Sequence, residues 1–161
     1  MSLKDELMVS LDAALPGAVE EAQEMRGETI LLVDGVSLYR VCQHLKEEMG
    51  FNCLTDVTAV DTLDLVFPSP ARFTLIYHLL RIPAGDRVRI KAAVGGDDPE
   101  IDSVADLWPA ANWGEREVFD LFGIHFQGHP DLRRIMMPDD WEGHPLRKDY
   151  PLRGFPGQRE V

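Results

Sequence analysis

The segment from Ile124 to Pro151 carries many large apolar side chains but follows neither a helical nor a strand period. It is dense in proline and glycine, yet it also holds aromatic residues such as Trp141 and Tyr150. Flexible linkers are polar and poor in aromatics, whereas Trp, Tyr, Met and Arg are enriched at protein interfaces. We therefore predict that residues 124–161 form an extended arm that lies on another polypeptide, which supplies the partners that the arm's backbone lacks.

The length and charge of the chain exclude several classes of protein. With 161 residues, 45% of them hydrophobic, it can build one domain core without disulfides. Its 16 basic and 28 acidic residues give a net charge of −12, which argues against nucleic acid or an anionic membrane surface as a partner. No stretch is apolar enough for a membrane span and Met1 to Asp12 shows no leader, so we expect a soluble, cytosolic chain. Cys42 and Cys53 are expected to be buried structural thiols.

Residues 1–111 have the patterns of an acidic α+β domain. Their net charge is −10, against −2 for residues 112–161, which we expect to form a capped helix and an irregular interface arm. Helical spacing marks residues 3–11 and 38–49, with Ser37 as the N-cap of the second helix. Strand patterns lie near residues 18–25, 30–33, 51–60, 72–81 and 86–94.

This order of helix, one or two strands, helix and three strands predicts a two-layer α+β fold with one mixed sheet and the helices on one face. Short connections between the last three strands favour antiparallel pairing. The last strand alternates, so that Arg87, Arg89 and Lys91 share one side. This basic stripe is interpreted as a solvated sheet face, with docking to another subunit as the alternative.

A short helix is expected between Asn112 and Gly123. Asn112 as N-cap with Glu115 three residues later is a capping-box arrangement, and Gly123 is placed to end the helix. Glu115 and Glu117 point to different helix faces, so they are not expected to act as a catalytic carboxylate pair.

Two roles are open to the histidines of the arm, as metal ligands or as turn residues. His125, His129 and His144, with Asp131, suggest zinc, but the glycine and proline that flank His129 deny the helix that would bring two imidazoles together. We expect the two Gly-His-Pro triplets to form tight turns whose imidazoles hydrogen-bond the backbone. The basic residues of this region suggest a phosphate or phospholipid site, but interleaved aspartates favour carboxylate pairs instead.

Three motifs make a specific resemblance: Glu115-Arg-Glu-x-x-Asp-Leu-Phe-Gly123, Phe126-x-Gly-His-Pro-x-Leu-x-Arg-Ile135 and Gly143-His-Pro-Leu-Arg-Lys-Asp-Tyr-Pro151. With Trp113, they resemble the signature of the thirty-kilodalton subunit of respiratory complex I, which is the C subunit of the bacterial enzyme. Less specifically, Val57-Thr-Ala-Val-Asp61 and Arg72-Phe-x-x-x-Tyr77 are similar to that family's α+β domain.

The resemblance implies a non-catalytic scaffold subunit in the peripheral arm of a proton-translocating NADH:quinone oxidoreductase, on the cytoplasmic side of the cell membrane. It implies no cofactor on this chain, although the complex carries FMN, iron–sulfur clusters and quinone. The implied partners are the forty-nine-kilodalton D subunit, near the quinone-reducing region, and neighbouring iron–sulfur subunits. The alternative is the homologous subunit of a membrane-bound energy-converting hydrogenase or of a ferredoxin- or F420-linked relative. The residues expected to face the partner or to fix the arm are Trp113, Arg116, Arg133, Arg134, Trp141, Arg147, Lys148 and Tyr150.

Overall fold

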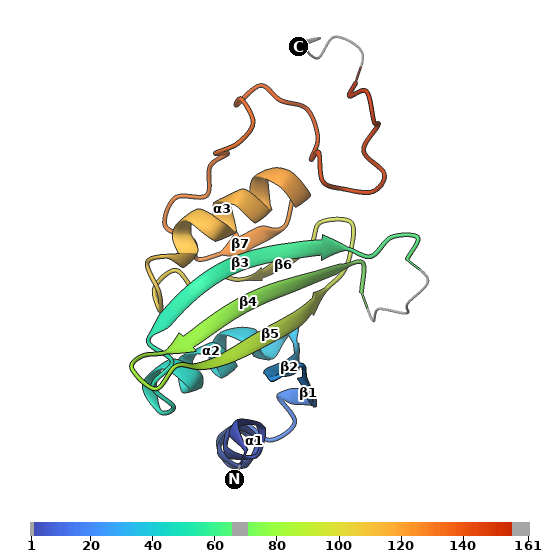
Figure 1. Ribbon diagram of the computed structural model, residues 1–161. Helices are drawn as coiled ribbons and strands as arrows, with labels where there is room; N and C mark the ends of the chain where they lie inside the picture. Colours follow the sequence, from blue (N-terminus) through green and yellow to red (C-terminus); the bar gives the residue numbers. More distant parts are fainter. Residues whose placement is uncertain (1, 66–70, 156–161) are drawn as a thin grey trace.

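In the computed structural model, which describes residues 2–65 and 71–155, the chain is organised around a five-stranded mixed sheet (Figure 1). The strands are, in chain order, β1(Val19–Met25), β2(Glu28–Asp34), β3(Cys53–Asp61), β4(Phe73–Arg81) and β5(Asp86–Val94). Their spatial order is β1-β2-β5-β4-β3, with β2 and β5 parallel and the other neighbours antiparallel. The predicted mixed sheet and the antiparallel pairing of the last three strands are confirmed.

Three helices and a small second sheet complete the fold. The helices are α1(Leu3–Ala14), α2(Leu38–Glu47), which follows a 3₁₀ turn η1(Gly35–Ser37), and α3(Ala111–Phe122). Two short strands, β6(Glu100–Asp102) and β7(His125–Gln127), pair in parallel and were not foreseen from the sequence. Within the described residues no helix has the length and apolar character needed to cross a bilayer.

The first two helices begin in different ways. The Ser2 hydroxyl accepts a hydrogen bond from the Asp5 N–H and the Asp5 carboxylate accepts one from the Ser2 N–H, so a capping box begins α1. The predicted cap by Ser37 is wrong, because the preceding 3₁₀ turn leaves this residue helical and its side chain caps nothing.

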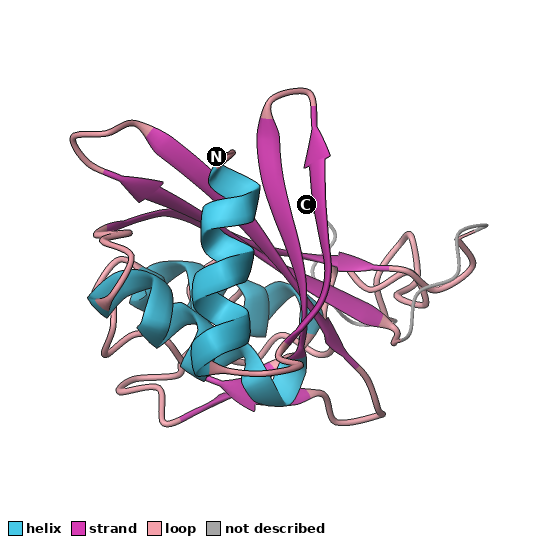
Figure 2. Cartoon of the chain, turned by 90° about the horizontal axis from the view of Figure 1, so that it is seen from below, coloured by secondary structure: helices cyan, strands magenta, loops and turns pink. Residues whose placement is uncertain are grey.

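Burial alternates along the central strands, and this alternation places the core. On β4 the side chains of Phe73, Leu75, Tyr77 and Leu79 are at most 1% exposed, while those between them are half-buried. The buried row belongs to one apolar cluster with residues of all three helices. The helices therefore cover one face of the sheet, as predicted, and in Figure 1 the strands β4 and β5 lie in front of α2. Figure 2 shows the same arrangement from below.

Candidate subunit interface

Helix α3 carries the first residues of the predicted interface, Trp113 and Arg116, and packs closely on β3. An ideal Cβ on Gly114 would lie 2.8 Å from the Val57 Cβ, so only glycine allows this approach. The predicted capping box of Asn112 and Glu115 is wrong. The helix begins at Ala111, after Ala110 in the N-cap position, and no side chain caps it.

Glu115 does not cap the helix and instead points into the core. Its side chain is fully buried, and its carboxylate accepts hydrogen bonds from the Ser103 hydroxyl and from the Val104 N–H at 2.8 Å. Burial is the main cause that raises the pKa of Glu115, to about 7, although both hydrogen bonds oppose it. This carboxyl group therefore ties the segment before α3 to the helix rather than serving a substrate.

Asp120, on α3, is the hub that fastens the arm. Its buried Oδ2 accepts three backbone N–H groups, from Ile135 at 3.0 Å, Met136 at 2.7 Å and Met137 at 2.8 Å. Its Oδ1 pairs with Arg134 Nη1 at 2.6 Å. Burial acts to raise the pKa of Asp120, but these hydrogen bonds outweigh it and hold the pKa below its ordinary value.

Arginine side chains add a second set of anchors, and most of them bind backbone carbonyls. Arg116 is buried, and its Nε and Nη2 donate to the carbonyls of Arg133 and Arg134 at 3.1 and 3.3 Å. Arg134 itself also reaches the Gly143 carbonyl at 3.1 Å. The expectation of carboxylate pairs is thus confirmed for Arg133 and Arg134. It is wrong for Arg116 and Arg147, which bind backbone carbonyls of irregular or terminal segments instead.

The two Gly-His-Pro turns are held as predicted, by imidazoles that bind the backbone. His129 Nδ1 accepts the Asp131 N–H at 3.0 Å, which leaves Nε2 to donate to the Asn112 carbonyl at 3.1 Å. His144 Nδ1 lies 2.8 Å from the Asp120 carbonyl. Burial is the main cause that lowers the pKa of both imidazoles. Among the described residues no group of three or more metal-ligating side chains is found.

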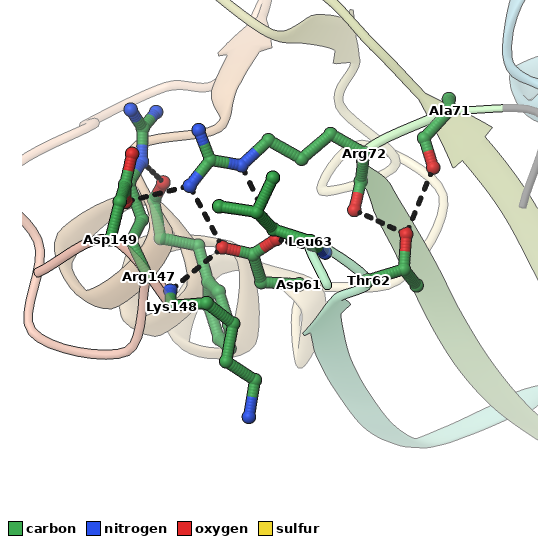
Figure 3. A network of polar contacts seen from close by, with 9 residues as sticks. Asp61, Thr62, Leu63, Ala71, Arg72, Arg147, Lys148 and Asp149 are labelled. Atoms are coloured by element: carbon green, nitrogen blue, oxygen red, sulfur yellow. Dashed lines mark hydrogen bonds and ion pairs between the residues drawn. The ribbon is translucent and has the colours of Figure 1, made fainter. Parts of the chain in front are cut away.

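A third anchor joins the far end of the arm to the sheet (Figure 3). At the end of β3 the buried Asp61 carboxylate accepts Arg72 Nε at 3.2 Å, Arg72 Nη2 at 2.9 Å and the backbone N–H of Lys148 at 2.9 Å. The guanidinium of Arg72 lies between Asp61 and Asp149, whose carboxylate it reaches at 2.7 Å. Nearby, Arg147 Nε donates to the Phe122 carbonyl at 2.6 Å.

These anchors correct the prediction that the arm lacks partners within its own chain. Residues 128–155 have no regular structure, but their backbone groups bond at defined points to α3 and to the end of β3. Phe126, assigned to the arm from sequence, lies in β7 and is 1% exposed in the core. The polar hub residues Asp61, Arg72 and Asp120 were not among the predicted site residues. For Asp120 the sequence did offer a signal, because it is a charged residue inside the apolar run of α3.

The predicted site residues fall into three groups. Arg116, Arg134 and Arg147 fix the arm, and Lys148 does so through its backbone N–H. Arg133 is exposed and pairs with Asp131 at 2.6 Å. The remaining three, Trp113, Trp141 and Tyr150, are aromatic.

The aromatic residues are divided between the surface and the arm's interior. Tyr150 packs edge-on against Phe155, with ring centroids 5.4 Å apart. The Trp141 indole N–H is buried and has no acceptor within the described residues. Trp113 is 62% exposed, and the Arg116 guanidinium lies over its ring, 4.9 Å from the centroid.

Beside Trp113 the surface is hollowed between β3 and α3. The hollow has a volume of about 240 Å³, and its walls include Leu54, Val57, Glu117 and Ile135. Exposed apolar side chains continue along the arm, at Met136, Leu146 and Leu152. The arm is thus fastened to its own chain and still presents apolar groups outward.

Relatives of known name match this chain over most of its length. The profile of the family described as respiratory-chain NADH dehydrogenase, 30 kDa subunit, matches residues 31–156. The C subunit of NADH-quinone oxidoreductase from Geotalea uraniireducens is 47% identical over 154 residues, which cover 96% of this chain and 92% of the relative. The same subunit from Trichlorobacter lovleyi is 49% identical over 148 residues, with 92% and 89% covered.

Solved structures agree. A trypsin-resistant fragment of Nqo5, residues 1–134, superposes with a TM-score of 0.69 at 36% identity and covers 78% of this chain and 98% of that one. A chain of the membrane-bound sulfane sulfur reductase, an archaeal respiratory membrane complex, superposes with a TM-score of 0.76 at 27% identity, covering 92% and 85%. Since sequence and fold match over most of the molecule, the chain belongs to the family of the respiratory-chain NADH dehydrogenase 30 kDa subunit.

Proposed function

We propose that this chain is a non-catalytic scaffold subunit in the peripheral arm of a proton-translocating NADH:quinone oxidoreductase. In this proposal it docks on the forty-nine-kilodalton D subunit near the quinone-reducing region and contacts neighbouring iron–sulfur subunits, on the cytoplasmic side of the membrane. Residues 1–111 serve as the platform and residues 112–161 as the interface segment. Family membership and the names of the closely similar bacterial relatives support the assignment to this complex.

One observation carries the scaffold role: Trp113 is exposed but held in place. Its ring lies under the Arg116 guanidinium, which is itself bonded to two carbonyls of the arm. A fixed aromatic ring beside a hollow suits a binding hot spot, because little side-chain freedom remains to be lost on docking. The hollow next to it would receive an apolar side chain of the partner.

The Trp141 side chain supports the same proposal. A buried indole N–H without an acceptor is costly, and the described part of this chain offers none. A small displacement of the indole on docking would bring this N–H to a carbonyl of the D subunit. The scaffold would thereby hold that partner in register, so that the terminal iron–sulfur cluster and the quinone pocket keep their geometry for electron transfer.

Trp113→Ala tests the proposal, because this exposed side chain can be removed without a cavity in the core. We expect the amount of assembled complex to fall several-fold, while NADH:quinone turnover per assembled complex stays near wild type. Val36→Ala is the matched control, since Val36 is 83% exposed and lies outside the arm. Normal assembly with reduced turnover would refute the scaffold role. Trp141→Ala and Arg147→Ala are expected to behave like Trp113→Ala.

The similarity to the archaeal complex supports a second candidate function. The TM-score of 0.76 over 92% of this chain favours a homologous role in a related membrane-bound machine, such as an energy-converting hydrogenase or a ferredoxin- or F420-linked complex. Affinity purification of the tagged chain from its host separates the two. Flavin- and NADH-binding subunits support the main proposal, and a nickel–iron large subunit supports the second.

A further inference from the structure

The face of the central sheet opposite the helices has a distinct composition. Its middle is formed by β4 and β5, where Ile76 lies across from Lys91, His78 from Arg89 and Leu80 from Arg87. We call the face formed by these six side chains the open face. In Figure 1 these two strands lie in front of the helix layer. The basic stripe noticed in the sequence is therefore set among half-buried aliphatic side chains.

The cations of the open face are poorly paired for so acidic a chain. Arginines elsewhere, such as Arg72 and Arg81, each bind two carboxylates. In the part of the chain that the structure describes, no carboxylate lies within ion-pair distance of Arg87 or Lys91. Arg87 and Lys91 therefore place two positive charges on this face that no carboxylate of the described chain neutralises, and an anionic group from outside would be attracted to them.

Arg89, between those two cations, lacks an acceptor for part of its guanidinium. Its Nη2 pairs with Glu28 at 2.6 Å, but its Nε is buried and meets no acceptor among the described residues. Buried donors are nearly always hydrogen-bonded in native proteins. This N–H is therefore an unused donor beside the open face.

A small hollow lies at the same place. Its volume is about 40 Å³, and its polar lining consists of Thr55, His78, Arg87, Arg89 and Glu28, the carboxylate that pairs with Arg89. One buried water needs roughly 10–15 Å³ of such space, so the hollow has room for a group the size of a carboxylate. It is too small for a nucleotide or a sugar.

We propose that the open face is a second docking surface, which binds an acidic segment of a partner subunit. A Glu or Asp side chain of that segment enters the hollow beside the Arg89 guanidinium. Its flanking aliphatic residues cover Ile76 and Leu80, while further carboxylates meet Arg87 and Lys91. An apolar centre with a charged rim is typical of protein interfaces, and the net charge of −12 disfavours polyanionic surfaces as the occupant.

The inference rests on the proposed assembly of the chain into a multi-subunit complex, but none of the residues that carry it belongs to the arm. The test uses the purified complex, and its probe is zero-length carbodiimide coupling. Carbodiimide converts a carboxylate into an O-acylisourea, whose acyl carbon the Lys91 amine then attacks, so that an amide forms and the carbodiimide leaves as its disubstituted urea. We expect Lys91 to couple to an Asp or Glu of another subunit, identified by mass spectrometry. We also expect acetylation of Lys91 by acetic anhydride to be at least fivefold slower in the complex than in the isolated chain.

Charge reversal supplies the second readout. Arg87→Glu with Lys91→Glu should lower the amount of chain that co-purifies with the complex at least fivefold at physiological salt. Lys4→Glu with Arg40→Glu is the matched control, because it makes the same change in charge on helices α1 and α2, which cover the other face of the sheet, and less than a twofold effect is expected. If the double reversal does not fold, the coupling and acetylation of wild-type Lys91 decide the question.

Three results would overturn the inference. They are full reactivity of Lys91 in an intact complex, coupling of Lys91 to lipid only, and unchanged co-purification of the folded double reversal. If no complex contains the chain at all, the proposed function fails instead. If the complex forms and Lys91 stays fully reactive, the open face alone is refuted.

Discussion

Replacing Asp120 with asparagine should release the arm at its central anchor. An amide oxygen can still accept the N–H groups of Ile135, Met136 and Met137, but the amide NH₂ then faces Arg134, and the ion pair at 2.6 Å is lost. Breaking one side of a buried ion pair costs about 3–5 kcal/mol. We take the lower end, about 3 kcal/mol, because Arg134 keeps bonds to two carbonyls.

Hydrogen exchange measures this loss where it occurs. A cost of about 3 kcal/mol corresponds to roughly 100-fold faster exchange of the three amides that Asp120 binds. Because the pKa of Asp120 is lowered in the folded state, its contribution is complete above the ordinary carboxyl pKa of about 3.9 and disappears as pH falls through the folded value. The difference between wild type and variant should thus be constant from about pH 5 to 8 and shrink below about pH 4.

Asp131→Asn is the matched control, since Asp131 also pairs with an arginine of the arm but is largely exposed. Its effect on the same amides should be close to nil, because exposed ion pairs contribute little. The reasoning is refuted if the two substitutions have equal effects, or if exchange of the three amides in Asp120→Asn stays within threefold of wild type.

Three further substitutions test other parts of the structure. Burial raises the pKa of Glu115 from 4.5 to about 7, so native protein holds a proton that the unfolded chain releases. Between about pH 4.5 and 7, urea denaturation should show wild type losing about 3 kcal/mol relative to Glu115→Gln; parallel pH profiles would contradict this. Gly114→Ala places a methyl group against Val57 and should cost about 1–2 kcal/mol in thermal denaturation, as overpacking outweighs the better helix propensity of alanine. Arg72→Gln leaves Lys148 with a weaker anchor, so limited trypsin digestion should cut there several-fold faster, and an unchanged cleavage rate would count against the anchor.

Alternation and helical spacing were sufficient to predict the body of the fold. The row Val88, Ile90, Ala92 and Val94 is buried as its spacing requires, because a strand with one covered face must alternate. Even the strand near residues 18–25, whose pattern is weak, is present as β1. These patterns are local, and each can be interpreted without knowing where the rest of the chain lies.

The arm was misjudged because its stabilising contacts are polar and distant in sequence. Asp61 binds the Lys148 N–H across 87 positions, and no local pattern announces such a contact. Asn112 and Glu115 have the spacing of a capping box, yet Glu115 turns inward because Ser103 and Val104 meet it from another segment. Tertiary hydrogen bonds here override the local signal.

Because the arm is anchored to its own chain, its apolar surface is ordered before any partner binds. A loose arm that orders only on its partner pays conformational entropy at the moment of binding. Here Asp120, Arg116 and Asp61 hold the irregular backbone beforehand, with carboxylates and guanidinium groups in place of a strand ladder. That cost is then met during folding of the chain itself, and in the proposed complex the surface around Trp113 would be presented in nearly its bound form. Irregular backbone that is pinned at a few buried charges can follow a partner's contour, as a helix or strand cannot, while remaining stiff enough to fix distances between neighbouring subunits. If instead Asp120→Asn freed the arm in hydrogen exchange but left assembly of the complex unchanged, preorganisation would have no role in docking.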